Sequence, residues 1–153
     1  MSVSVQEADF DVGAETAALS AGRLDVGAVA TFVGLVRADK LSGEGSEVSA
    51  MTLEHYPGMT EKSLEAIVTE AGGRWALQGV RVIHRFGRLL PGERIVFVGV
   101  ASAHRGDAFA ACEFIMDYLK TRAPFWKKED TPEGGRWVDA READDSAAAR
   151  WAE

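Results

Sequence analysis

The order of apolar and polar residues along this chain of 153 residues predicts several short β-strands. Residues 2–7 alternate valine with polar residues, which is the pattern of a half-buried strand. Residues 27–36 are rich in β-branched and aromatic side chains and predict a buried strand. Further strands are expected at 48–55, 80–86, 94–101 and 136–138. Since only the turn sequence Leu-Pro-Gly-Glu at 90–93 and a few flanking residues separate 80–86 from 94–101, we expect these two strands to be antiparallel.

Apolar residues recur at helical spacing in two segments, 60–71 and 107–121. Pro124 ends the second helix. The apolar stripe of this helix consists of Ala108, Cys112, Ile115, Met116 and Leu119. A third helix is expected in the alanine-rich stretch 14–21, and a frayed helix or tail after Trp137. Helices that alternate with strands around an antiparallel pair predict an α+β domain whose sheet is covered by helices.

Length and composition indicate one globular domain that covers residues 1–153. The chain has 46% hydrophobic and 27% charged residues, which is ordinary for a globular protein. No apolar stretch approaches the roughly 20 residues that span a bilayer, and the N-terminus lacks a secretory pattern, so no membrane association is expected. An acidic chain of net charge −7 is also a poor candidate for general nucleic-acid binding.

The chain has a single cysteine, Cys112, which cannot form an intramolecular disulfide. This fits the reducing environment of the cytoplasm. Its place on the apolar stripe predicts a buried core thiol rather than a nucleophile.

One segment, 104–128, is basic within this acidic chain. It holds five cationic residues against three acidic ones, so its net charge is +2 while that of the whole chain is −7. A proline and aromatic residues lie between the cations at its end. A basic segment in an acidic protein favours an anion-binding site, although a solvated helix face with a charged end is an alternative.

His104 and Arg105 follow the strand at 94–101 and open the helix after it. The free backbone N–H groups and the positive dipole end of a helix N-terminus attract phosphate, and Arg105 adds a bidentate donor. His104 adds a further donor or a proton carrier. The alternative is structural, with a histidine that caps the turn and an arginine that pairs with Asp107.

Lys120 and Lys127 flank the end of the same helix. Neighbouring cations and aromatic walls favour loss of a lysine proton, which suits an acid, a base or a nucleophile. Cations that complement the helix dipole are an equally good explanation. Lys120 follows Arg105 by 15 residues, which is about 22 Å along a straight helix. One small substrate cannot touch both ends, so a shared site predicts a dimer in which a second copy supplies one end.

Arg37 ends the strand at 27–36 and precedes 38–47, a Gly- and Ser-rich stretch that is expected to be a mobile loop. Arg37 is either a binding cation beside this loop or a solvated charge at a strand end. His55 and His84 are isolated at strand ends and no paired His or Cys spacing occurs, so no metal site is expected. Glycine-rich nucleotide-binding loops and the Gly-x-Ser-x-Gly motif are also absent from the sequence.

Four stretches resemble a known family, the large, catalytic subunits of molybdopterin synthase. They are TLEHYPGMTEK (52–62), VIHRFGRLLPGE (82–93), FVGVASAHRGDAF (97–109) and FIMDYLKTRAPFWKKE (114–129). The resemblance covers roughly residues 27–141. It implies an α/β hammerhead fold with an additional small antiparallel sheet. It also implies a homodimer without a cofactor, in which each subunit binds one small ubiquitin-like subunit to give a heterotetramer.

The reaction implied by the resemblance is a sulfur transfer in molybdenum cofactor biosynthesis. Cyclic pyranopterin monophosphate becomes molybdopterin when two sulfurs are inserted as a dithiolene. The sulfur arrives as a thiocarboxylate on the C-terminal Gly-Gly tail of the small subunit. A chain without a usable cysteine of its own agrees with sulfur that is delivered by a partner.

The same resemblance implies the residues of a substrate pocket. Lys120 and Lys127 are expected to be catalytic. The positions expected to contact substrate are Phe32, Leu35, Val36, Arg37, His104, Arg105, Met116, Lys120, Lys127, Lys128, Glu129 and Arg141. Leu35 stands where the family often has a basic residue, so only a backbone contact is expected there. After about residue 141 the chain is expected to form a tail.

Two other functions fit the same residues. A phosphate-metabolite binding module would use the lysines only to hold an anion, and it would bind the pterin phosphate without chemistry. A scaffold subunit would use the basic groove only to dock the acidic tail of a ubiquitin-like partner. Its affinity for the pterin would not change when His104 or Arg105 is neutralised.

Overall fold

The computed structural model describes residues 1–38, 49–131, 134–138 and 142–152. Its helices are α1 (Val12–Ala18), α2 (Met59–Arg74), α3 (Arg105–Arg122) and α4 (Glu142–Ala149). Its strands are β1 (Ser2–Gln6), β2 (Ala28–Leu35), β3 (Ala50–His55), β4 (Leu77–Arg85), β5 (Gly87–Leu89), β6 (Arg94–Ser102), β7 (Phe125–Thr131) and β8 (Gly134–Val138). No helix among these residues is long and apolar enough to cross a membrane.

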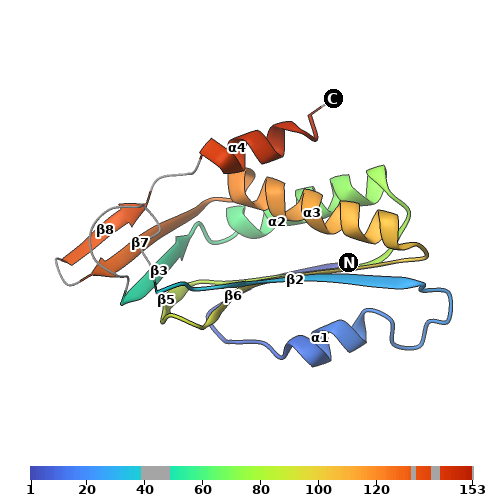
Figure 1. Cartoon of the computed structure of the whole chain (residues 1–153), viewed down its shortest axis with the longest axis horizontal. Coiled ribbons are helices and arrows are strands. Elements are labelled where there is room, and N and C mark those ends of the chain that lie inside the picture. Colours follow the sequence, from blue (N-terminus) through green and yellow to red (C-terminus); the bar gives the residue numbers. More distant parts are fainter. Residues whose placement is uncertain (39–48, 132–133, 139–141, 153) are drawn as a thin grey trace.

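The main sheet has four strands in the order β1-β4-β6-β2. β6 pairs antiparallel with both β4 and β2, while β1 joins the edge parallel to β4. Helices α2 and α3 cover one face of this sheet, and α1 lies against the other face (Figure 1). The antiparallel pair expected on either side of the turn at 90–93 is confirmed, and so is the α+β class.

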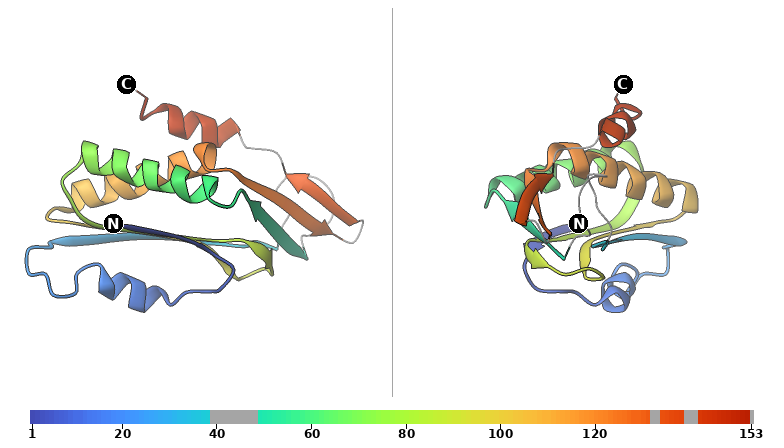
Figure 2. Two further views of the ribbon diagram at one scale, coloured as in Figure 1. Left: turned by 180° about the vertical axis from the view of Figure 1, so that it is seen from behind. Right: turned by 60° about the vertical axis from the view of Figure 1, so that its left-hand side comes forward.

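A second, smaller sheet has the order β5-β3-β7-β8 and is antiparallel throughout. It extends from the end of the molecule at which α3 finishes (Figure 2). The sequence pattern predicted β3 and β8 but not β5 or β7. Charged residues occupy both faces of β7, so its sequence has no strand-like alternation. It becomes a strand through its pairing with β3, from Ala50 opposite Asp130 to His55 opposite Phe125.

The main core lies between the large sheet and helices α2 and α3. The predicted apolar stripe of α3 is buried along its whole length: Ala108, Cys112, Ile115, Met116 and Leu119. Cys112 is a free, buried thiol, as the sequence predicted. Burial raises its pKa to about 11, which disfavours the thiolate that a nucleophile would need.

The C-terminal segment is a docked helix, where the sequence had predicted a frayed helix or tail. α4 lies against α3 (Figure 1). Trp151, which follows it, packs edge-on against Trp75 and Phe114, with ring centroids 5.6 Å away in each case. Its Nε1 donates to the Asp117 carboxylate at 2.7 Å, and Arg150 pairs with the same carboxylate at 2.9 Å. The docking was not predictable from the helix itself, because the residues that anchor it lie beyond its end.

Candidate functional site

Helix α3 carries candidate cations at both of its ends. It begins directly after β6 and runs back along the sheet, antiparallel to β6 and therefore in the direction of β4 (Figure 1). Its first turn lies near the start of β4, and its last turn lies near the end of β4.

His104 and Arg105 are exposed at the start of α3. His104 is the N-cap residue, with an extended backbone, and its side chain makes no capping hydrogen bond. Asp107 lies in the first turn, yet among the described residues no ion pair joins it to Arg105. The structure therefore does not contain the alternative arrangement, in which His104 caps the helix and Arg105 pairs with Asp107. The helix N-terminus keeps the donors that the sequence predicted for an anion.

Lys120 and Lys127 lie near a buried histidine at the other end of α3. This residue, His84, is close to the end of β4 and is 5% exposed. Its pKa is lowered to about 3, first by burial and then by the positive charges of Lys120 and Lys127. Both ammonium groups therefore lie close enough to His84 to act on its charge.

Alternation along β7 decides which of its lysines faces this histidine. The ring of Phe125 stacks on His84, with centroids 3.8 Å apart and planes 20° apart. Lys127 is two residues further along and shares the face of β7 with Phe125. Lys128 faces the opposite side, where its ammonium lies 5.9 Å from the centre of the Trp137 ring. A pocket on the His84 side would reach the side chain of Lys127 but only the backbone of Lys128.

The end of β2 brings Arg37 to the same end of the main sheet. Leu35 is the last residue of β2 and pairs with Arg94 of β6. His84 of β4 pairs with Val96, two positions further along β6. Arg37 follows Leu35 by two residues and is exposed. It therefore lies at the same end of α3 as Lys120.

The turn between β5 and β6 fixes the backbone around Val36. The N–H of Val36 donates to the carbonyl of Glu93 at 2.9 Å, and its carbonyl accepts from the N–H of Gly92 at 2.8 Å. Val36 is buried, while the side chain of the preceding Leu35 is 53% exposed and apolar. Any polar contact from these two positions to a substrate would have to come from the backbone.

The remaining predicted positions have varied surroundings. Phe32 lies on the edge strand β2 and is 42% exposed, whereas Met116 of α3 is buried in the main core. Glu129 is fully buried and shares the face of β7 with Lys127. Arg141 lies outside the described residues, as does all but the first residue of the expected loop 38–47.

The structure thus separates the predicted cations into two groups. Arg37, Lys120 and Lys127 gather at one end of α3. His104 and Arg105 lie at the other end, about 22 Å away along the helix. One protomer does not bring the two groups together, as the helix length predicted.

His84 lies near the end of β4, as the sequence predicted, but it is buried and its ring stacks on another residue. Its partner Phe125 comes from β7, which the sequence pattern did not reveal as a strand. A signal was nevertheless present: Val80 and Val82 precede His84 at alternate positions of β4, and both are buried. A histidine that continues a buried apolar row is rarely a solvated strand end.

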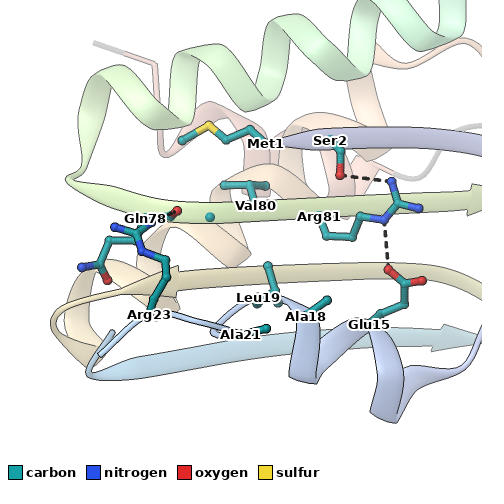
Figure 3. A pocket seen from close by; sticks show the side chains of 11 residues that line it. Met1, Ser2, Glu15, Ala18, Leu19, Ala21, Arg23, Gln78, Val80 and Arg81 are labelled. Carbon is teal, nitrogen blue, oxygen red and sulfur yellow. Dashed lines mark hydrogen bonds and ion pairs between the residues drawn. The ribbon is translucent and has the colours of Figure 1, made fainter. Parts of the chain in front are cut away.

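A cavity of about 340 Å³ lies between α1 and the far face of the main sheet (Figure 3). Its most prominent cation, Arg81, is bonded to Glu15 at 3.0 Å and to Ser2 at 3.1 Å. A second arginine, Arg23, donates to the carbonyl of Gln78 at 2.7 Å. Both guanidinium groups are engaged in hydrogen bonds within the fold. The main sheet separates the cavity from α3. It is therefore not the candidate site.

Comparisons with known proteins identify the family. Residues 5–122 match the MoaE protein family. The molybdopterin synthase catalytic subunit of Ralstonia nicotianae is 64% identical over 149 residues, which cover 97% of this chain and 83% of that protein. The solved molybdopterin biosynthesis MoaE protein from Burkholderia ambifaria has a TM-score of 0.81 at 57% identity and covers 99% of both chains.

A more distant structure shares the fold. The complex of subunits 1 and 2 of molybdopterin-converting factor from Helicobacter pylori contains a chain with a TM-score of 0.68 at 18% identity, which covers 92% of this chain and 90% of that chain. The resemblance drawn from four sequence stretches, the fold that it implied and the activity that it implied are confirmed by these relatives. The chain belongs to the MoaE protein family.

Proposed function

We propose that this chain is the catalytic subunit of molybdopterin synthase, a sulfurtransferase that converts cyclic pyranopterin monophosphate to molybdopterin. The observation that carries the proposal is the convergence of Lys120 and Lys127 beside His84 at one end of α3. Two primary amines beside a buried, uncharged ring offer both proton transfer and anion stabilisation at one place. The family to which the chain belongs supports the same reaction.

The two lysines have separate tasks. Lys120 acts at the carbon that receives sulfur, either as acid and base or through a transient covalent link. Lys127, together with Arg37, orients the incoming thiocarboxylate and stabilises the negative charge that develops during transfer. Cys112 takes no part, because it is buried and its pKa is raised. The sulfur therefore comes from a partner, a small ubiquitin-like subunit with a C-terminal Gly-Gly thiocarboxylate.

His104 and Arg105 hold the phosphate of the substrate at the mouth of α3. Exposed donors, free backbone N–H groups and the helix dipole favour an anion there. Because this group lies about 22 Å from Lys120 along the helix, the phosphate of a substrate bound at Lys120 contacts the helix mouth of a second copy. Each active site is thus built from two protomers of a homodimer.

The other predicted positions complete the pocket. Leu35, Val36 and Lys128 contribute through the backbone, since their side chains are apolar or face away. Where the N–H is already bonded within the fold, as in Val36, the carbonyl oxygen accepts a second hydrogen bond. The pocket wall and its charge balance come from Phe32, Met116, Glu129 and Arg141. The chain works as one domain, with one small subunit on each protomer of a heterotetramer. A complex of two subunits is known for the Helicobacter pylori molybdopterin-converting factor, which supports this assembly. The protein is located in the cytoplasm, which agrees with its free thiol and with relatives that act in cofactor synthesis.

Reconstitution tests the function directly. The chain is mixed with thiocarboxylated small subunit and cyclic pyranopterin monophosphate, and the dithiolene product is measured. The parent protein is expected to form product, and Lys120→Ala is expected to bind the small subunit normally but to form almost none. Tight binding of the pterin without product would instead indicate a binding module. A chain that binds the small subunit, and whose affinity for the pterin is the same in Arg105→Ala as in the parent, would indicate a scaffold.

A further inference from the structure

Helix α3 passes into β7 through a tight turn at Pro124. Ala123 is the C-cap residue of the helix, and its carbonyl accepts from the N–H of Phe125 at 3.0 Å, which closes a three-residue γ-turn. Lys120 lies in the last turn of α3, and Lys127 is the third residue of β7. The direction in which the chain leaves this turn therefore sets how the two lysines lie relative to each other.

A threonine of α2 binds this turn through a buried hydroxyl. Thr60 is 0% exposed, and its Oγ1 donates to the carbonyl of Pro124 at 3.1 Å. The same Oγ1 accepts from the N–H of Tyr56 at 3.0 Å. Since proline has no N–H, the carbonyl is the only main-chain polar group that Pro124 offers, and Thr60 binds it.

The register of the small sheet shows what this hydroxyl replaces. The last pair of β3 and β7 is His55 opposite Phe125, so the next pair in the same register would be Tyr56 opposite Pro124. The ladder stops there, because the hydroxyl of Thr60 stands between the N–H of Tyr56 and the carbonyl of Pro124. One oxygen atom thus joins α2, the end of β3 and the turn between α3 and β7, which meet at this end of the molecule (Figure 2).

Thr60 is the polar member of an otherwise apolar row. The buried residues of α2 are Thr60, Leu64, Ile67, Val68 and Ala71. A buried hydroxyl costs free energy unless it is hydrogen bonded, and valine has nearly the same shape as threonine. Packing alone would therefore be served equally well by valine. The hydroxyl of Thr60 is explained by the two hydrogen bonds that it makes.

We infer that Thr60 is a positioning residue of the active site, which fixes Lys127 relative to Lys120 by holding the carbonyl of Pro124. The inference rests on the function proposed above. Helix α3 is held by the main core and β7 by its pairing with β3, so the turn between them is the joint at which the two lysines would shift. A displacement of about 1 Å can slow a reaction by about 100-fold. Thr60 prevents such a shift through the backbone.

The first test replaces Thr60 in the complex with thiocarboxylated small subunit. Thr60→Val keeps the shape of the side chain but has no hydroxyl, while Thr60→Ser keeps the hydroxyl and loses only the methyl group. The single-turnover rate of dithiolene formation is expected to fall by about 10-fold or more in Thr60→Val. It should stay within about threefold of the parent rate in Thr60→Ser. The precursor concentration for half-maximal rate should change by less than about threefold in both variants.

Val68→Ala is the matched control for loss of stability. Val68 belongs to the same helix and is buried in the main core. This variant should melt at a lower temperature than the parent but, where it is folded, keep the parent rate within about twofold. Thr60→Ala is a second variant, which removes the hydroxyl without placing a methyl group against the carbonyl. It should be slowed like Thr60→Val.

Melting curves and small-subunit binding show whether each variant is folded. A folded Thr60→Val or Thr60→Ala protein with the parent rate would overturn the inference. So would a Thr60→Ser protein as slow as Thr60→Val, because the methyl group and not the hydroxyl would then matter. Equal slowing in Val68→Ala would also overturn it, since the rate would then follow the stability of the fold.

Amide hydrogen exchange reports on the bridge without turnover. The N–H of Tyr56 is expected to exchange slowly in the parent and in Thr60→Ser, and at least about 10-fold faster in Thr60→Val, where its acceptor is gone. Unchanged exchange in Thr60→Val would contradict the role of the bridge. The two proposals fail separately. A parent protein that forms no dithiolene refutes the function, whereas an active parent whose rate does not depend on the hydroxyl of Thr60 refutes only the positioning.

Discussion

The ammonium group of Lys128 lies 5.9 Å from the centre of the Trp137 ring, on the face of β7 that points away from His84. The adjacent Lys127 shares the other face with Phe125. Two consecutive lysines with the same charge therefore have different surroundings, and only one of them is directed at the proposed site.

This difference predicts unequal effects of the two alanine substitutions. Lys127→Ala should slow dithiolene formation by about 100-fold or more, because it removes a cation from the site of developing charge. Lys128→Ala should slow it by less than about threefold, since a contact between a cation and the exposed ring of Trp137 contributes little. Single-turnover assays with thiocarboxylated small subunit measure both. Equal losses in the two variants would contradict the assignment of faces.

Active sites shared between protomers predict that two inactive variants restore activity when mixed. Lys120→Ala and Arg105→Ala damage opposite ends of α3, so a mixed dimer contains one site with both ends intact and one with neither. After subunit exchange at equal amounts, activity should rise to about one quarter of the parent value. The control is a mixture of Lys120→Ala with Lys127→Ala, which damage the same end and should stay inactive. Sites built within one protomer would give no recovery in either mixture.

Burial of His84 makes a contribution to stability that depends on pH. The folded protein binds a proton at His84 only near pH 3, whereas the unfolded chain binds it near pH 6.5. Stability from this residue is therefore complete above about pH 6.5 and is lost as the pH falls towards 3. Between about pH 7 and pH 5 the parent should lose about 2 kcal/mol more free energy of unfolding than His84→Gln. Denaturant titrations at both pH values measure this difference, and parallel losses in the two proteins would contradict it.

Docking of the C-terminal helix should depend on Trp151. Its ring packs against Trp75 and Phe114, and its Nε1 donates to Asp117. Trp151→Ala should lower the free energy of unfolding by about 2 kcal/mol, less than for a fully buried tryptophan because Trp151 is partly exposed. Trp126→Ala, at a residue that is 48% exposed, is the control and should cost about 0.5 kcal/mol or less. Urea unfolding of the two variants makes the comparison.

The thiol of Cys112 should be dispensable and unreactive. Burial raises its pKa to about 11, so the folded protein should resist alkylation by iodoacetamide at about pH 8, while the urea-unfolded protein reacts. Cys112→Ala should retain at least about half of the parent rate of dithiolene formation, since the sulfur is delivered by the partner. If alkylation of the folded protein lowered the rate of dithiolene formation, Cys112 would take part in the reaction.

Features that follow from local periodicity were predictable from the sequence. The spacing of apolar residues gave α3 its buried stripe and placed Cys112 in the core. The number of residues between Arg105 and Lys120 was enough to show that the two ends of the helix cannot meet on one substrate. Both conclusions need only the geometry of a helix, which the chain determines over short distances.

Features that depend on distant partners were not predictable in this way. β7 is a strand because it pairs with β3, about 75 residues earlier in the chain, and its own charges hide the pattern. The stack of Phe125 on His84 was not foreseen, because Phe125 reaches His84 only through that pairing. The docking of α4 depends on Trp151, which lies beyond the helix. Such contacts require the assembled tertiary structure.

In the proposed site, the 18 residues of helix α3 set the distance between the cations that hold the phosphate and the lysines that act in sulfur insertion. One additional turn would lengthen that spacing by about 5.4 Å and would move the helix mouth away from the phosphate of a substrate bound at Lys120 of the other copy. Insertions and deletions should consequently be tolerated in the exposed segment 21–25 between α1 and β2 far better than within this helix. An evolving or engineered version of the protein can alter the identity of the helix residues more freely than their number.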